Sequence, residues 1–155
     1  MKVTTTSILS IAAKEAVISL WNSEYPQQLK HADAASFDNY LSGLGAVLHF
    51  LLTDEAAMLQ GWAITFSRNE ERWFAIILNR STHGKGLGTF LLQALKEKER
   101  VLNGWVINTG DDVKANGEAY RSPLAFYLKN DFVLYPEIRL ETTVMSAVKI
   151  RWTRK

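Results

Sequence analysis

The chain has 155 residues, of which 47% are hydrophobic and 22% are charged, with a net charge of +2. This composition is globular and excludes a disordered chain, and the small, dispersed charge gives no indication of a nucleic-acid or membrane partner. The lack of cysteine excludes disulfides and thiolate metal sites and fits a reducing compartment. No apolar stretch has the length of a signal-peptide core or a membrane span, so we expect one soluble, cytoplasmic domain over residues 1–155.

The first third of the chain predicts a short strand and two helices. Residues 7–11 indicate the strand, and residues 12–21 carry apolar side chains at helical spacing before Pro26 breaks the pattern. Asp33 can cap the second helix, which Gly43 and Gly45 end.

Three strands then follow at short intervals, over residues 46–52, 58–66 and 72–78. Polar residues fill the breaks between them, which favours an antiparallel meander. In the middle strand Trp62, Ile64 and Phe66 alternate with smaller residues, so one face carries most of the bulk.

A glycine-rich turn links the third of these strands to a helix. Gly84, Gly86 and Gly88 stand at alternate positions, and the helix that follows has its apolar face at Leu87, Phe90, Leu91, Ala94, Leu95, Val101 and Leu102. Such a turn leaves main-chain N–H groups unpaired at the positive end of a helix dipole, which suits a phosphate. An ordinary strand-to-helix turn is the alternative interpretation.

The spacing of the glycines distinguishes this turn from two known phosphate-binding motifs. The order G-x-G-x-G differs from the G-x-G-x-x-G of dinucleotide folds, and the G-x-x-x-x-G-K-[ST] of nucleotide triphosphatases is absent.

The last third predicts a strand, a loop, a helix and a hairpin. Residues 104–108 form a strand parallel to 72–78, because a helix connects the two. A polar loop spans 109–121, and Ser122-Pro123 starts a helix that runs to about Asn130. Residues 133–140 and 144–152 complete a strand pair.

Two motifs resemble those of the GCN5-related N-acetyltransferases. The stretch from His83 to Gly88 resembles their coenzyme A signature R/Q-x-x-G-x-G/A, with His83 in the R/Q place. The stretch 125–132 resembles their A-x-x-F-Y-x-x-x-G-F segment, with Tyr127 as the tyrosine and Asn130-Asp131 where glycine is usual. The resemblance spans nearly the whole chain. It implies a single α/β (α+β) domain with a mixed, mostly antiparallel sheet of six to seven strands, about four helices, and a V-shaped splay between the fourth and fifth strands.

The resemblance also implies a site and a reaction. Acetyl-coenzyme A would lie in the splay, an amine would attack its thioester directly, and Tyr127 would act as general acid, with a core aromatic residue as the alternative for Tyr127. A main-chain N–H near Ile76 or Ile77 would bind the oxyanion. No metal is implied, and the lack of cysteine favours a ternary complex. The coenzyme-binding residues implied are Ile76, Ile77, Leu78, His83, Gly84, Lys85, Gly86, Leu87, Gly88, Thr89, Asn108 and Ser122.

The general base and the acceptor stay open. Candidates for the base are His49, Glu70, Glu71, Asp111, Asp112 and Glu118, each of which has an ordinary structural explanation. Trp62 and Trp73 could line an acceptor slot or belong to the core. The acceptor is expected to be a small-molecule or peptide amine, and the chain a monomer or a homodimer formed through its terminal strands. A non-catalytic acyl-coenzyme A sensor and a nucleotide-binding module remain as other functions.

Overall fold

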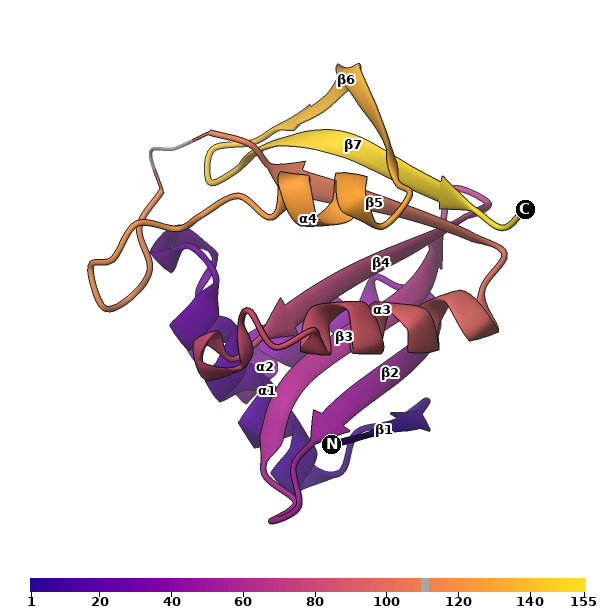
Figure 1. Cartoon of the computed structure of the whole chain (residues 1–155). Helices are drawn as coiled ribbons and strands as arrows, with labels where there is room; N and C mark the ends of the chain where they lie inside the picture. The colour runs from indigo at the N-terminus through magenta and orange to yellow at the C-terminus, as the bar shows by residue number, and fades with distance from the viewer. Residues whose placement is uncertain (110–111) are drawn as a thin grey trace.

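The computed structural model describes residues 1–109 and 112–155, and its centre is a mixed sheet of seven strands (Figure 1). The strand order is β1-β2-β3-β4-β5-β7-β6. The strands are β1 (Lys2–Thr6), β2 (Gly45–Thr53), β3 (Leu59–Arg68), β4 (Glu71–Leu78), β5 (Val101–Ile107), β6 (Val133–Glu141) and β7 (Ser146–Thr153). The helices are α1 (Ile11–Glu24), α2 (Ala34–Ser42), α3 (Leu87–Lys98) and α4 (Leu124–Lys129), with short 3-10 turns η1 (Gln27–Leu29) and η2 (Arg80–Thr82).

The sheet opens between its fourth and fifth strands. Every other neighbouring pair is antiparallel, whereas β4 and β5 are parallel and pair only where Trp73 meets Asn103. From that point the two strands diverge toward their carboxyl ends (Figure 1). The predicted meander, the parallel pair and the splay between the fourth and fifth strands are thus confirmed.

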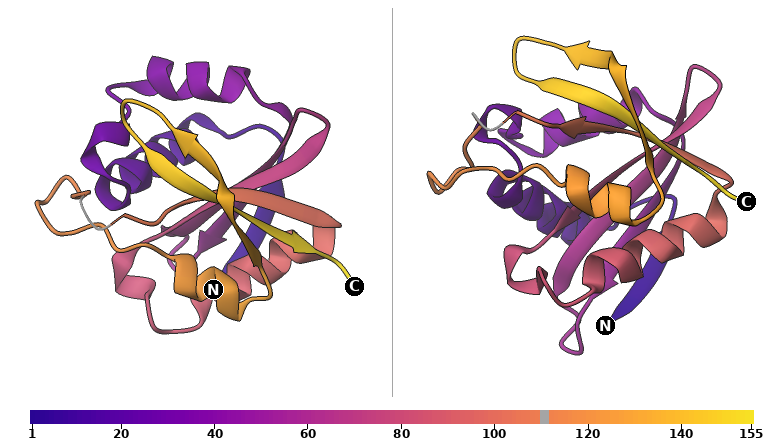
Figure 2. Two further views of the ribbon diagram at one scale, coloured as in Figure 1. Left: turned by 90° about the horizontal axis from the view of Figure 1, so that it is seen from above. Right: turned by 45° about the horizontal axis from the view of Figure 1, so that its top comes forward.

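Helices cover both faces of the sheet (Figure 2). Trp62, Ile64 and Phe66 of β3 pack with Val17 and Trp21 of α1 on one face. On the other face, leucines of α3 and Tyr127 of α4 pack against β2, β4, β5 and β7. The alternation predicted for β3 is therefore confirmed, with its bulky face toward α1 and α2.

The first strand was predicted in the wrong place. It spans Lys2–Thr6, where three consecutive threonines favour an extended chain, and it pairs with β2. Residues 7–11 instead lead into α1, since the Ser10 hydroxyl accepts a hydrogen bond from the Ala13 N–H at 3.1 Å and so caps that helix.

The apolar face predicted for α3 also needs correction. The helix ends at Lys98, and Val101 and Leu102 lie in β5, paired with β7. Phe90 is 46% exposed, whereas Leu92 is buried. The helical spacing of apolar residues continues past Glu99, although the backbone there is extended and the helix has ended. The spacing alone therefore assigned two strand residues to the helix.

The start and end of α4 differ slightly from the prediction. The helix begins at Leu124, whose N–H donates to the Ser122 hydroxyl at 3.3 Å. At its end Asp131, the second of the two residues that stand where glycine is usual, has the left-handed backbone conformation with φ of 69°. Within the described residues, no helix is both long and apolar enough to cross a bilayer.

Candidate functional site

A cleft of about 730 Å³ lies where β4 and β5 diverge. Its walls come from the carboxyl end of β4, the glycine turn, the end of α1, residues 114–123 and α4. It collects most of the residues predicted to bind or to react: Ile76, Ile77, Leu78, His83, Gly84, Gly86, Gly88, Thr89, Ser122 and Tyr127. Lys85 is exposed on the turn, and Leu87 is half-buried against the core. Asn108 lies outside the cleft lining, where its amide oxygen accepts a hydrogen bond from Arg139 at 3.0 Å.

The edge of β4 presents main-chain groups to this cleft. Just past the strand, the Asn79 N–H donates to the carbonyl of Gln60 at 2.8 Å, on the β3 side. Main-chain groups alternate between the two edges of a strand, so the N–H and C=O groups of Ile76 and Leu78 face β5. The Arg72 carbonyl agrees with this alternation, because it accepts a hydrogen bond from Asn103 of β5 at 2.9 Å. Since β5 has moved away beyond Asn103, Ile76 and Leu78 have no strand partner there among the residues described.

The start of α3 opens on the same cleft. Gly84 and Gly86 have φ of 78° and 76°, the left-handed region that favours glycine, and a Cβ on either would meet open space. No side chain caps the helix at Gly86. A Cβ on Gly88 would lie 3.1 Å from Leu78 and from Phe126, so this glycine lets the helix approach β4 and α4. The first N–H groups of α3, at the positive end of its dipole, are therefore available to an anion.

Three tyrosines from distant segments line the cleft: Tyr25 at the end of α1, Tyr120 in the loop before α4, and Tyr127 in α4. Burial raises the pKa of Tyr127 and of Tyr25 well above the ordinary value, and it raises the pKa of Tyr120 to about 12. All three phenols can donate a proton at neutral pH, and none can accept one.

Two ion pairs that the sequence did not predict stand in the cleft wall. Lys114 Nζ lies 2.8 Å from Glu24 Oε1, and Arg80 pairs with Glu118. Glu24 and Lys114 are separated by 90 positions in the chain, so no local pattern could have brought them together.

The predicted candidates for a base lie in different surroundings. His49 is buried and accepts a hydrogen bond from Trp62 Nε1 at 3.1 Å, and burial lowers its pKa to about 4. Asp112 accepts a hydrogen bond from Gln28 and is outside the cleft lining. Asp111 lies outside the described residues. Of these candidates, Glu118 lines the cleft, and the hydrogen bond from Arg80 lowers its pKa.

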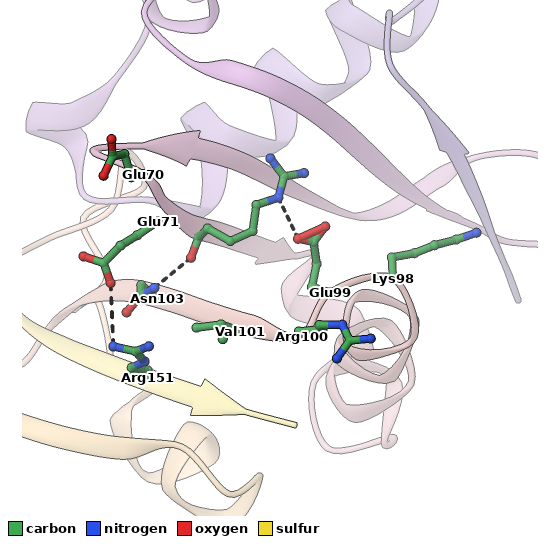
Figure 3. A pocket seen from close by; sticks show the side chains of 9 residues that line it. Glu70, Glu71, Lys98, Glu99, Arg100, Val101, Asn103 and Arg151 are labelled. Atoms are coloured by element: carbon green, nitrogen blue, oxygen red, sulfur yellow. Dashed lines mark hydrogen bonds and ion pairs between the residues drawn. The ribbon is translucent and has the colours of Figure 1, made fainter. Parts of the chain in front are cut away.

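Glu70 and Glu71 lie at the opposite end of β4, in a second cavity of about 400 Å³ (Figure 3). Here Arg72 Nε pairs with Glu99 at 2.6 Å, and Arg151 lies 3.7 Å from Glu71. Arg72 also donates to hydroxyls of β3, so these charges join β3, β4, β7 and the end of α3. This cavity lies at the closed end of the splay, and Glu70 and Glu71 are not in the lining of the cleft that holds Tyr127.

The tryptophans proposed for an acceptor slot are core residues. Trp62 has no exposed surface and packs among α1 and α2, and Trp73 is 6% exposed. Trp73 stacks on Trp105 of β5, with ring centroids 5.3 Å apart, at the point where the two strands separate. The slot hypothesis is therefore wrong. No group of three or more histidine and carboxylate side chains suited to a metal occurs in residues 1–109 and 112–155.

The strand order, the splay and the helix arrangement together are the fold of the GCN5-related N-acetyltransferases. No protein-family model and no curated protein matches the sequence. Solved structures do match across nearly the whole chain. An aminoglycoside 6'-N-acetyltransferase in complex with coenzyme A has a TM-score of 0.73 and 10% identity, covering 99% of this chain and 97% of that one.

Two further structures extend this likeness. A phosphinothricin acetyltransferase of the GNAT superfamily from Sinorhizobium meliloti, with acetyl-coenzyme A, has a TM-score of 0.66 and 13% identity, covering 99% and 89% of the two chains. A ribosomal-protein-alanine N-acetyltransferase from Brucella melitensis has a TM-score of 0.69 and 13% identity, covering 99% of both. The fold implied by the two sequence motifs is thus confirmed.

Proposed function

We propose that the chain is an acetyl-coenzyme A-dependent N-acetyltransferase that transfers the acetyl group directly to a primary amine. The observation that carries this proposal is one cleft bounded by an unpaired strand edge, an uncapped helix start and a protonated tyrosine. These three features match the pantetheine arm, the pyrophosphate and the departing thiolate, in that order. The acetyltransferases that share the fold support it.

Each part of the coenzyme has a binding partner in this proposal. The pantetheine amides pair with the free main-chain groups of Ile76 and Leu78, as an added strand would. The pyrophosphate accepts hydrogen bonds from the N–H groups of residues 84–88, since the His83 N–H already donates to the Arg80 carbonyl at 3.2 Å. The Thr89 hydroxyl and the Lys85 ammonium flank it. Leu87 contributes its N–H only, since its side chain packs toward the core.

The reaction needs two donors, and the cleft has a candidate for each. The Ile76 N–H faces the splay, so it is the oxyanion donor, whereas the Ile77 N–H faces β3 by the same alternation. Tyr127 donates a proton to the thiolate, because burial holds its phenol protonated. Without cysteine, the amine attacks the thioester itself in a ternary complex.

The first test is calorimetric titration with acetyl-coenzyme A, NAD and ATP, followed by an assay of free thiol release with primary amines. We expect selective binding of acetyl-coenzyme A and amine-dependent release of coenzyme A. Preference for NAD or ATP would support a nucleotide-binding module and overturn the proposal. Binding of acetyl-coenzyme A without any turnover would identify a sensor instead.

A further inference from the structure

A carboxylate at the end of α1 lies in the cleft wall where helix stability does not favour it. Glu24 is the last residue of α1, next to the negative end of the helix dipole, and its side chain is 13% exposed. Its oxygens are held by Lys114 Nζ at 2.8 Å and by the Arg80 N–H at 3.2 Å. Replacing a buried ion pair by apolar residues is often neutral or stabilising, so stability alone does not account for a charge at this position, and we look for its role in the cleft.

The ion pair between Glu24 and Lys114 is not needed to hold the loop segment around Lys114 against the end of α1. Pro26 and Lys114 already form a main-chain bridge, and the Gln27 N–H donates to the carbonyl of Val113 at 2.8 Å. These main-chain contacts fix the loop against the end of α1 whether or not the side chains carry charge.

The phenols and the second carboxylate of the cleft are poorer candidates than Glu24 for accepting a proton. Tyr25, Tyr120 and Tyr127 are kept protonated by burial. Glu118 is exposed to solvent and pairs with Arg80, so an amine bound there would stay hydrated. Among the residues described, Glu24 is the carboxylate in the cleft lining that is shielded from water.

On the basis of the transferase function proposed above, we propose that Glu24 binds the acceptor as a cationic alkylamine and removes its proton. A carboxylate can accept about four hydrogen bonds. Lys114 and Arg80 occupy two of these sites, which leaves room for an ammonium group. Tyr25 follows Glu24 directly, and its ring lies 6.5 Å from that of Tyr120, so aromatic groups flank the bound cation.

The acetyl transfer needs no reactant other than the amine and acetyl-coenzyme A. The ammonium gives one proton to Glu24, and the free amine forms a bond to the thioester carbon. The carbon–sulfur bond then breaks, and Tyr127 protonates the sulfur. The new amide nitrogen returns a proton to the Tyr127 phenolate, and Glu24 releases its proton to water with the products. Glu24 is thus a catalytic residue, since it touches the reacting amine.

Two probe amines separate this role from a structural one. n-Butylamine is protonated at neutral pH and needs a base, whereas aniline is largely unprotonated and does not. We expect Glu24→Gln to lower kcat/KM for n-butylamine by about 10²-fold or more, and that for aniline by roughly threefold or less. Glu15→Gln, which changes an exposed carboxylate of the same helix outside the cleft lining, is the matched control and should leave both rates nearly unchanged.

Lys114→Met provides a second variant, because it breaks the same ion pair but keeps the carboxylate. It should retain the wild-type preference for n-butylamine over aniline. The role of Glu24 would be overturned if Glu24→Gln lowered kcat/KM equally for both amines. It would also be overturned if Lys114→Met no longer preferred n-butylamine to aniline as the wild-type protein does. Calorimetric titration of each variant with acetyl-coenzyme A runs alongside, since failure of the wild-type protein to bind it would overturn the proposed function itself.

Discussion

A Cβ added at Gly104 of β5 would lie 2.6 Å from the ring of Phe74 in β4. The two residues meet just beyond the Trp73–Asn103 pair, on the face covered by α3 and α4. The Phe74 ring also contacts Tyr127 and Phe132, with centroids 5.6 and 5.4 Å away. Because Gly104 has no side chain, the Phe74 ring can pack closely against β5, and this contact sets the packing at the base of the splay.

Gly104→Ala is therefore expected to destabilise the protein by about 1–3 kcal/mol, because Phe74 is held by aromatic neighbours and cannot move freely. Urea denaturation measures the free energy of unfolding. Gly43→Ala is the control, since its added Cβ would make an ordinary contact of 3.7 Å with the Tyr40 carbonyl. Equal stability of Gly104→Ala and Gly43→Ala would contradict this account of the splay.

The sequence predicts those parts of the fold that local patterns determine. Asp33 caps α2 as expected, because its carboxylate accepts a hydrogen bond from an N–H three residues on. The glycine turn and the strand alternation around Trp62 are equally local. The pair of Glu24 and Lys114 depends on a contact between distant segments, which no periodicity encodes.

The difference between local patterns and contacts of distant segments also explains where the sequence-based predictions are wrong. Threonine-rich residues 2–6 pair with a strand more than 40 positions away, and that pairing places β1 there and not at residues 7–11. The motif around Tyr127 locates one wall of the cleft, whereas Tyr25 and Tyr120 carry no motif and reach it through tertiary packing.

Tyr127→Phe should slow amine acetylation by about 10²–10⁴-fold, because the departing thiolate loses its proton donor. Binding of acetyl-coenzyme A should stay near the wild-type value, since the strand edge and the helix start are unchanged. Thiol release and calorimetry measure the two quantities. Tyr135→Phe, on exposed β6, controls for loss of a phenol elsewhere and should have wild-type turnover. Wild-type turnover in Tyr127→Phe as well would remove Tyr127 from the reaction.

Gly86→Glu should abolish binding of acetyl-coenzyme A, because it adds a negative side chain at the start of α3. Gly117 offers a matched control, with φ of 85° and open space around its Cβ position, as at Gly86 with φ of 76°. Both substitutions carry a similar backbone strain of about 1–2 kcal/mol, but Gly117 lies outside the cleft lining. Calorimetric titration should show loss of binding in Gly86→Glu and retained binding in Gly117→Glu. Similar affinities in the two variants would remove the phosphate from this turn.

His49 should make the stability of the protein fall in mild acid. Burial lowers its pKa from an ordinary 6.5 to about 4, so the unfolded chain binds a proton that the folded chain excludes between these values. The stabilisation is complete above pH 6.5 and is lost as the pH falls through 4, by about 3 kcal/mol in all. His49→Gln keeps an acceptor for the Trp62 N–H but has no charge to gain. Urea denaturation at pH 7 and pH 4.5 should show a loss about 2 kcal/mol larger in the wild-type protein than in this variant, and equal losses would mean that His49 does not stay neutral in the fold.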